Sequence, residues 1–435
     1  MEFSKHNIFS KIADSDNYYI VNPLSGQADI LEADEAQKFI EKKITRTQVY
    51  IDKGYLVDPK EEEKLFKKKY LDFIDERDKD EVQLFFTPWY TCNFDCSYCF
   101  QDEYTNANDK VKTEVIDAFY QYVDKQFVDR KKYITLFGGE SLLNSPSKKE
   151  AIKLILEKAS DRKLDIAIVT NGYNIPEYID LMKRSSIREV QVTMDGTQKV
   201  HDSRRILKGG QGSFDKIVEG IDLLLENHIP VNLRMIVDKD NINNLPELAR
   251  FAKEKGWTKS PLFKTALGRN YELHHCQTNN SRLFSRIEMY QEIYKLVNKY
   301  PEILEFHKPT FSISKFIFEN GELPNPLFDS CSGGKTEWAF DYSGKIYSCT
   351  ATVGNQGDEL GTFYPKIKLN EDLICEWEER DVLSIKECNN CPVQLACGGG
   401  CAAIAKSKSG KLHSPDCRPI QGLLELGIGI YSEHN

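Results

Sequence analysis

The twelve cysteines of this 435-residue chain are distributed unevenly, and their spacing constrains its fold and chemistry more than any other feature. Three lie between residues 92 and 99, eight lie between residues 331 and 417, and Cys276 stands apart. In a reducing compartment, clustered cysteines bind metal or carry out redox chemistry more often than they form disulfides. Cysteines that only filled a core would not gather in this way. The distribution therefore predicts metal or redox chemistry in two regions.

The net charge and the hydropathy of the chain indicate which kinds of binding partner are not expected. The formal net charge is −9, whereas phosphate-binding surfaces are usually basic, so nucleic acid is not expected as the main partner. No apolar run approaches the roughly 20 residues that a membrane-spanning helix needs. The first residues lack the apolar stretch of a secretory signal. These features predict a cytoplasmic protein with no membrane partner.

The chain is too long for one ordinary domain, and its patterns predict three. Residues 1–80 are expected to form a small α+β domain, with strands at 7–12, 18–22 and 28–31 and helices at 33–43, 45–53 and 59–79. Residues 325–425 contain short strands, cysteine and glycine without regular alternation. Because such a segment has little apolar core of its own, we expect metal clusters to hold it together.

Between these regions, strands alternate with helices, a pattern typical of a parallel α/β sheet. The expected strands are residues 82–87, 133–137, 165–170, 189–194, 231–237 and 261–266. The expected helices are residues 111–128, 149–159, 176–183, 214–226, 245–255 and 282–299. Six βα units are too few for an eight-stranded barrel, so residues 81–315 predict an open, partial (β/α)6 barrel of the TIM type. Functional residues of such folds gather at the C-terminal ends of the strands.

Cys92, Cys96 and Cys99 form a CxxxCxxC pattern soon after the first expected barrel strand. Three thiolates bind three irons of a [4Fe–4S] cluster and leave the fourth iron open to a small molecule, whereas ferredoxin-type clusters use four cysteines. The alternatives are a structural zinc site, which usually has four ligands in paired spacing, and three buried thiols. The pattern favours a cluster with one open iron.

Further motifs follow the successive barrel strands. Gly-Gly-Glu at 138–140 ends the second strand, Thr-Asn-Gly at 170–172 follows the third, and Thr-Met-Asp-Gly at 193–196 ends the fourth. His-Asp-Ser-Arg-Arg at 201–205 then precedes a glycine-rich stretch at 209–214. Taken singly, Gly-Gly-Glu is typical of a turn, and the two arginines are typical of a surface ion pair.

Together, the cysteine loop and these motifs resemble the radical S-adenosylmethionine (SAM) superfamily over residues 80–310. The resemblance implies that the loop cysteines hold a [4Fe–4S] cluster that binds SAM. It also implies that Gly138, Gly139 and Glu140 hold the amino group of SAM, Asn171 and Thr193 meet its ribose and sulfonium region, Arg205 pairs with its carboxylate, and Tyr98 contacts its adenine. Arg234, on the fifth strand, is a further candidate.

Seven cysteines of the C-terminal region resemble the SPASM domain, which accompanies radical SAM enzymes that modify peptides and proteins. Zinc binding is the alternative. The resemblance implies two auxiliary [4Fe–4S] clusters. The ligands of the first would be Cys331, Cys349 and Cys401, and those of the second would be Cys388, Cys391, Cys397 and Cys417.

The first auxiliary set lacks a fourth cysteine. In the anaerobic sulfatase maturases, which the chain resembles, this cysteine lies between the first two, but residues 332–348 contain none. Either Cys375 or Cys276 completes the set, or one iron stays open and accepts a substrate thiolate. Those relatives also carry an aspartate as general base where this chain has Thr350. Oxidation of a sulfatase residue is therefore less expected, and no catalytic base is assigned.

The resemblance implies an enzyme that reductively cleaves SAM to methionine and a 5′-deoxyadenosyl radical, which abstracts hydrogen from a ribosomally made precursor peptide. A thioether or carbon–carbon crosslink is the expected product, and a flavodoxin or ferredoxin is the expected reductant. The alternatives are sulfatase-type protein oxidation and a non-catalytic iron–sulfur electron carrier or zinc scaffold. Residues 6–58 resemble, in element order only, winged-helix domains that bind leader peptides by strand addition. A structural cap on the barrel is the other interpretation.

Overall fold

Six parallel strands follow one another in chain order across the largest sheet of the described structure. The computed structural model describes residues 1–43, 47–99, 101, 104, 110–270 and 280–434. The six strands are β6 (Val82–Thr87), β8 (Lys132–Leu136), β9 (Ile166–Thr170), β10 (Ile187–Thr193), β12 (Val231–Val237) and β13 (Phe263–Arg269). Each pairs in parallel with the next. The expected α/β architecture with a large parallel sheet is confirmed.

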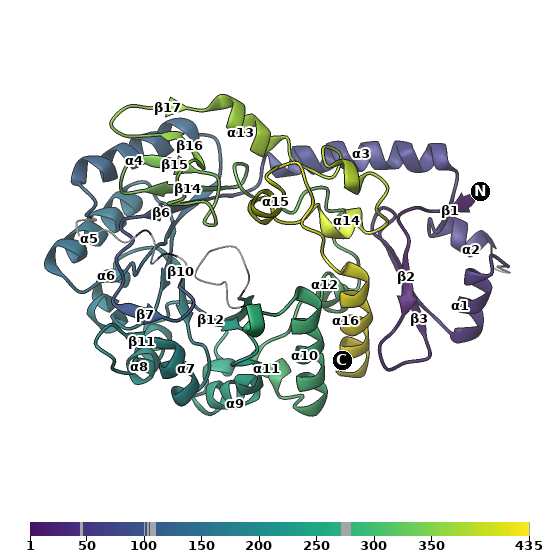
Figure 1. Ribbon diagram of the computed structural model, residues 1–435, viewed down its shortest axis with the longest axis horizontal. Coiled ribbons are helices and arrows are strands. Elements are labelled where there is room, and N and C mark those ends of the chain that lie inside the picture. The colour runs from purple at the N-terminus through teal and green to yellow at the C-terminus, as the bar shows by residue number, and fades with distance from the viewer. Residues whose placement is uncertain (44–46, 100, 102–103, 105–109, 271–279, 435) are drawn as a thin grey trace.

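Helices connect these strands and lie along the outer side of the sheet (Figure 1). They are α4 (Thr113–Gln126), α5 (Pro146–Asp161), α6 (Ile179–Met182), α7 (Gln198–Arg204), α8 (Phe214–Glu226) and α9 (Leu245–Glu254). In α8, the buried residues Phe214, Ile217, Ile221 and Leu224 recur every three or four positions. This spacing places them on one helical face, which packs in the same hydrophobic core as the strands.

Strand β12 shows how the sheet separates its core from its polar interior. Val231, Leu233 and Met235 are buried, whereas Arg234 between them is half-buried. Successive side chains of a strand point to opposite faces, so Arg234 points away from the apolar core and toward the inside of the barrel. The fold can therefore hold charged groups beside the strand ends without placing them in the core.

The C-terminal region extends the central sheet. Strand β14 (Glu337–Asp341) pairs in parallel with β6, and β15 (Lys345–Tyr347), β16 (Glu359–Thr362) and β17 (Lys368–Leu369) add to it in antiparallel pairs. Trp338, Ala339 and Phe340 of β14 are buried. The expectation of short strands was correct. The sequence did not indicate that they join the barrel sheet, and hence that apolar packing also anchors this region.

The N-terminal region packs against the C-terminal helix. It consists of β1 (Glu2–Phe3), β2 (Ile8–Lys11), β3 (Tyr18–Asn22), β4 (Gln27–Leu31), α1 (Ala33–Ile40), α2 (Thr47–Asp52), β5 (Leu56–Val57) and α3 (Pro59–Arg77). The Tyr19 hydroxyl donates to the carbonyl of Gln421 (3.0 Å), and the Ala13 amide donates to that of Glu425 (3.1 Å). The first and last segments of the chain therefore lie together, as Figure 1 shows.

The remaining strands pair with each other, and the remaining α-helices follow the barrel strands in the chain. They are β7 (Phe94–Cys96), β11 (Arg205–Leu207), α10 (Arg286–Lys299), α11 (Ile303–Phe306), α12 (Ser314–Asn320), α13 (Glu371–Glu378), α14 (Gln394–Cys397), α15 (Ala402–Ser409) and α16 (Ile420–His434). Within the described ranges, no helix combines the length and the apolar character that crossing a membrane requires.

Candidate functional site

The three loop cysteines lie together just beyond the end of β6. The short strand β7 ends at Cys96, and it pairs antiparallel with β11 so that Cys96 stands opposite Arg205. Burial, the Glu140 carboxylate and the other two sulfurs raise the pKa of Cys92 to about 12. Crowded, buried thiols of this kind ionise readily only when a cation compensates their charge, as metal binding does. The donor set therefore fits an iron–sulfur cluster.

A cavity of about 260 Å³ adjoins the three sulfurs at the carboxyl ends of the strands. It brings together six of the residues that the sequence assigned to SAM, namely Tyr98, Gly138, Gly139, Asn171, Thr193 and Arg205. Its wall also includes Thr350 and Ala351 from the cysteine-rich segment. Motifs from four strand ends and from the C-terminal region thus meet at one place.

Gly138 and Gly139 let the backbone pass through a tight part of the wall. Their φ angles are 97° and 41°, a left-handed region that favours glycine. A Cβ atom on Gly139 would lie 2.3 Å from the carbonyl oxygen of Thr91. The Gly139 amide donates to Oε1 of Gln101 (2.8 Å), and Gln101 itself lines the cavity. Sequence reasoning missed Gln101, whose only signal is its position two residues after Cys99.

Replacing Gly139 by alanine (Gly139→Ala) is expected to lower SAM affinity at least about tenfold. The new methyl group collides with backbone rather than with a side chain that can rotate away, so the loop leading to Cys92 has to move. Isothermal titration of SAM into the anaerobically reconstituted enzyme measures the change. Gly256→Ala is the matched control, since φ is also positive there (76°) but no atom lies within 4 Å of the added Cβ. Equal SAM affinity in wild type and Gly139→Ala would contradict the prediction.

Glu140 lies behind the cavity wall. Its carboxylate accepts hydrogen bonds from the Leu142 amide (2.8 Å), the Thr170 hydroxyl (2.5 Å) and the Asn171 amide (2.6 Å). It is not among the residues that line the cavity. In the described structure, Glu140 therefore ties the end of β8 to the end of β9, while its assignment to the amino group of SAM stays a prediction.

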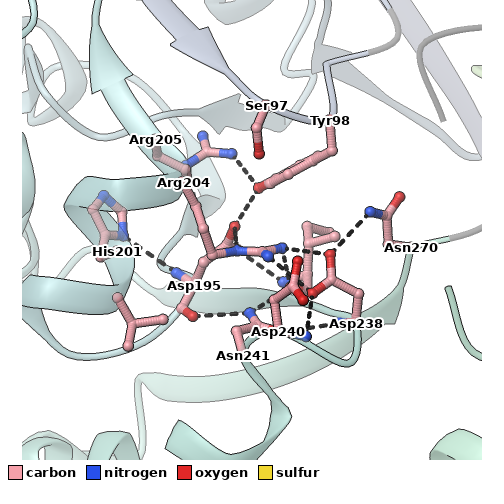
Figure 2. Close-up of polar contacts among 12 residues, drawn as sticks. Ser97, Tyr98, Asp195, His201, Arg204, Arg205, Asp238, Asp240, Asn241 and Asn270 are labelled. Carbon is pink, nitrogen blue, oxygen red and sulfur yellow. Dashed lines mark hydrogen bonds and ion pairs between the residues drawn. The ribbon is translucent and has the colours of Figure 1, made fainter. Parts of the chain in front are cut away.

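Arg205 presents a buried donor to the cavity. One Nη atom of Arg205 donates to the Tyr98 hydroxyl (2.7 Å), which in turn donates to Oδ2 of Asp195 (2.6 Å), as Figure 2 shows. Among the described residues, no partner is recorded for the buried Nε atom of Arg205. A buried donor without an acceptor is costly, so this guanidinium suits an anionic ligand such as a carboxylate.

Arg204 joins the same network through Asp195 (Figure 2). Its two Nη atoms bind Oδ1 and Oδ2 of Asp238 (2.9 and 3.0 Å), and its Nε atom binds Oδ2 of Asp195 (3.2 Å). Arg204 and Arg205 are only 6 % and 8 % exposed, so the surface ion pair suggested by the dipeptide alone is wrong. Arg204 therefore binds two buried carboxylates, whereas Arg205 lines the cavity.

His201 is neutral and contacts the same network. Burial and the nearby Arg205 lower the pKa of His201 to about 3. Nδ1 accepts a hydrogen bond from the Asp195 amide (3.2 Å), which makes Nε2 the donor to the Ser213 hydroxyl (3.0 Å). The Ser213 hydroxyl donates onward to the carbonyl of Arg205 (2.8 Å). The histidine and the glycine-rich stretch therefore position Arg205.

The seven SPASM-like cysteines form two groups in the structure. Burial, then Glu337, Cys331 and Cys401 raise the pKa of Cys349. Burial and the sulfurs of Cys397, Cys391 and Cys417 raise the pKa of Cys388 to about 11. The cysteines that act on one another in this way are those that the sequence assigns to each expected ligand set, and their binding of clusters stays a prediction. They are Cys331, Cys349 and Cys401 in one group, and Cys388, Cys391, Cys397 and Cys417 in the other.

A glutamate joins the two segments of the first group. The Glu337 carboxylate accepts from the Ser332 hydroxyl (2.8 Å) and the Thr350 amide (3.0 Å), the residues that follow Cys331 and Cys349. Of the candidates for a fourth ligand, Cys375 is exposed on α13, and Cys276 lies outside the described residues. The described geometry therefore gathers three sulfurs here.

The groups of cysteine sulfurs described above differ from a site for a single metal ion. Within the described ranges, no three histidine, cysteine or acidic side chains stand close enough to share a single ion. A [4Fe–4S] cluster spreads its ligands over different irons, so its thiolates stand farther apart than the ligands of one zinc ion. Thiolates are also the ligands that iron–sulfur clusters prefer.

Comparison with known proteins identifies the barrel region. Residues 86–252 match the family model of the radical SAM superfamily. The serine-type anaerobic sulfatase-maturating enzyme of Bacteroides thetaiotaomicron is 31 % identical over 170 residues, which cover 38 % of this chain and 41 % of that enzyme. The match thus spans less than half the length of this curated relative.

Two solved structures share the fold over much more of the chain. Native anSMEcpe with bound AdoMet superposes with a TM-score of 0.63 and 18 % identity, covering 81 % of this chain and 99 % of that one. Streptococcus suis SuiB bound to S-adenosylmethionine superposes with a TM-score of 0.54 and 14 % identity, covering 95 % and 98 %. SuiB has also been solved bound to its precursor peptide SuiA.

Proposed function

We propose that this chain, which carries a radical SAM domain at residues 86–252, is an enzyme that cleaves SAM reductively and modifies a ribosomally made peptide. The observation that carries the proposal is the shared cavity. Cys92, Cys96 and Cys99 lie on one side of it, Arg205 lies in its wall, and Thr350 brings the cysteine-rich segment to the same space. An iron–sulfur carrier needs the sulfurs but has no use for a ligand cavity beside them.

Each part of the cavity has a task toward bound SAM. Cys92, Cys96 and Cys99 would hold the cluster, and Arg205 would bind the carboxylate of SAM. Gly138 and Gly139 allow close backbone approach, while Tyr98, Asn171 and Thr193 contact the rest of the molecule. With the cluster bound, one-electron reduction cleaves SAM to methionine and a 5′-deoxyadenosyl radical, which abstracts hydrogen from the peptide. The protein orients the reactants and keeps competing reactions out.

The cysteine-rich segment supports the proposal that the substrate is a peptide. The spacing of its cysteines resembles that of a domain that accompanies peptide- and protein-modifying enzymes, and we propose that its two sulfur groups hold two auxiliary [4Fe–4S] clusters. These clusters would take up the product electron or bind the substrate while a thioether or carbon–carbon crosslink forms. The peptide-bound structure of SuiB supports the same class of substrate. A flavodoxin or ferredoxin in the cytoplasm would supply electrons.

We propose three functional units: residues 1–80, 81–315 and 325–425. The first contains the sheet β2-β3-β4, in which β4 is an edge strand among the described strands. Three of the five residues of β4 are exposed, so its backbone can pair with an added strand. We therefore propose that residues 1–80 receive the leader segment of the precursor peptide.

Sulfatase-type protein oxidation is the alternative enzyme function. The sequence similarity to a sulfatase-maturating enzyme favours it. The Thr350 position argues against it, because the base expected there is absent from the sequence and the Thr350 amide is bonded to Glu337. Peptide modification without that base is therefore the preferred proposal.

Release of 5′-deoxyadenosine tests the proposal. The full chain, reconstituted anaerobically with iron and sulfide, is mixed with dithionite and SAM, and the products are separated by chromatography. We expect 5′-deoxyadenosine and methionine in equal amounts, and neither product without dithionite. Intact clusters, verified by electron paramagnetic resonance, with no 5′-deoxyadenosine would overturn the proposal in favour of an electron carrier.

A further inference from the structure

A second cavity, of about 520 Å³, lies between the open side of the barrel and the cysteine-rich segment. Four arginines line it: Arg234 from β12, Arg269 from β13, Arg286 from the start of α10, and Arg418 beside the second sulfur group. Its volume is within the range of roughly 300–1,000 Å³ that is usual for ligand pockets. Arg286 and Arg418 have no role in the functions assigned above.

The cavity connects the sites already described. Arg234 and Arg269 line both this cavity and the one beside the loop cysteines. Cys401, a member of the first auxiliary sulfur group, lies in its wall. A molecule bound here would therefore extend from the place of hydrogen abstraction toward an auxiliary cluster.

Acidic side chains are scarce around this cavity in the described part of the chain. Among the described residues that line the cavity, there is no aspartate or glutamate. Asp416 approaches from behind, with Oδ2 3.8 Å from an Nη atom of Arg286. One Nη atom of Arg269 donates to the carbonyl of Phe284 (2.6 Å), and the buried Nε atom of Arg418 has no recorded partner in the described structure. Concentrated positive charge of this kind favours an anionic ligand.

The strand opposite Arg234 makes room for its guanidinium. A Cβ atom on Gly268 of β13 would lie 3.0 Å from both Nε and Nη2 of Arg234. Any larger residue at 268 would press against the charged group. The neighbouring strand thus leaves space for the arginine to stand between the two cavities.

The rest of the wall is apolar, with Met289, Ile313, Ile404 and Leu423 among its residues. Apolar surface combined with guanidinium groups suits a peptide that carries acidic side chains better than it suits a small inorganic anion. We propose that this cavity binds an acidic segment of the substrate peptide, with glutamate or aspartate carboxylates on the arginines. The inference rests on the proposed function, because it specifies the substrate of the same enzyme.

Arg286 provides the sharpest test, since it lines only the second of the two cavities. The probes are two fluorescent hexapeptides, acetylated and amidated, that alternate glycine with glutamate or glycine with glutamine. Fluorescence anisotropy with the reconstituted full-length enzyme and SAM gives their dissociation constants. We expect the glutamate peptide to bind at least about tenfold more tightly than the glutamine peptide, because several charge-assisted hydrogen bonds are at stake.

Variants assign that preference to the cavity. Arg286→Gln is expected to lose most of it, and Arg286→Lys to keep more of it because the charge remains. Lys295→Gln is the matched control, since it removes one positive charge from an exposed site on the same helix. Equal binding of the two peptides by the wild type, or an unchanged preference in Arg286→Gln, would overturn the proposal.

Further outcomes separate the competing explanations. A third probe is the glutamine peptide with a free C-terminal carboxylate. If it binds tightly and the two amidated peptides do not, the cavity binds a chain end, which would overturn the assignment to acidic side chains. If Arg286→Gln alters the paramagnetic signal of an auxiliary cluster but not the peptide preference, the arginines serve the cluster and the proposal fails.

Peptide preference without 5′-deoxyadenosine release would refute the proposed enzyme function instead. Release without preference would refute only this inference.

Discussion

Cys96→Ala is expected to abolish SAM cleavage, lowering 5′-deoxyadenosine release to the level of the dithionite-free control. Removing one of three loop thiolates leaves the proposed cluster without a ligand, and Cys96 also stands opposite Arg205 where β7 pairs with β11. The loss should therefore affect both electron delivery and the wall that binds SAM. Chromatography of the products and iron analysis of the purified protein measure the effect.

Two other cysteines test where this effect resides. Cys397 belongs to the second auxiliary group, so we expect Cys397→Ala to retain part of the SAM cleavage while losing iron. Cys375→Ala removes an exposed thiol outside both sulfur groups and is expected to keep the full iron content. Cleavage that survives in Cys96→Ala but disappears in Cys397→Ala would refute the assignment of the loop cysteines to SAM.

Arg204→Met is expected to lower the free energy of unfolding by about 3–5 kcal/mol, which is typical when one partner of a buried ion pair is removed. The substitution keeps an unbranched side chain in place of the arginine methylenes but leaves Asp195 and Asp238 without their shared cation, and both carboxylates are fully buried. The Tyr98 hydroxyl and the Ile236 amide still contact Asp195, so the fold should survive. Urea unfolding of the reduced apoprotein measures the change.

Lys253→Met is the matched control for Arg204→Met. It breaks an ion pair with Glu305 in which the two side chains are 47 % and 54 % exposed. Solvent screens such pairs, so the cost should lie within about 0–1 kcal/mol. If the two variants unfold at the same urea concentration, the buried network of Arg204, Asp195 and Asp238 contributes no more than a surface pair, and the prediction is wrong.

Local sequence patterns predicted the elements of the barrel closely. The strands expected at residues 82–87 and 231–237 and the helix expected at 214–226 have the same bounds in the structure. These segments have strong periodicity and are buried on a defined face, so their local preferences agree with the fold. Residues 176–183 were expected to form one helix and instead form a short turn, Ile175–Glu177, followed by α6. Pro176 within the segment favours this interruption.

Side-chain directions were harder to predict than positions along the chain. Of the Gly-Gly-Glu motif, Gly138 and Gly139 line the cavity, whereas the Glu140 carboxylate turns toward β9. Gln101 and Arg269 line the cavity although no motif contains them. Whether a side chain faces a ligand or its own protein depends on which donors the neighbouring strands present, and one sequence does not display those neighbours.

The sequence by itself determined the α/β alternation, the clustering of the cysteines in two regions and the glycines beside the loop cysteines, because these features depend on local periodicity, ligand type and backbone freedom. Tertiary structure alone decided how they meet. It placed β14 beside β6, brought Thr350 to the cavity of the loop cysteines, and gathered four arginines from distant segments around a second cavity. These contacts join residues far apart in the chain, and their geometry arises only when the elements pack into one core.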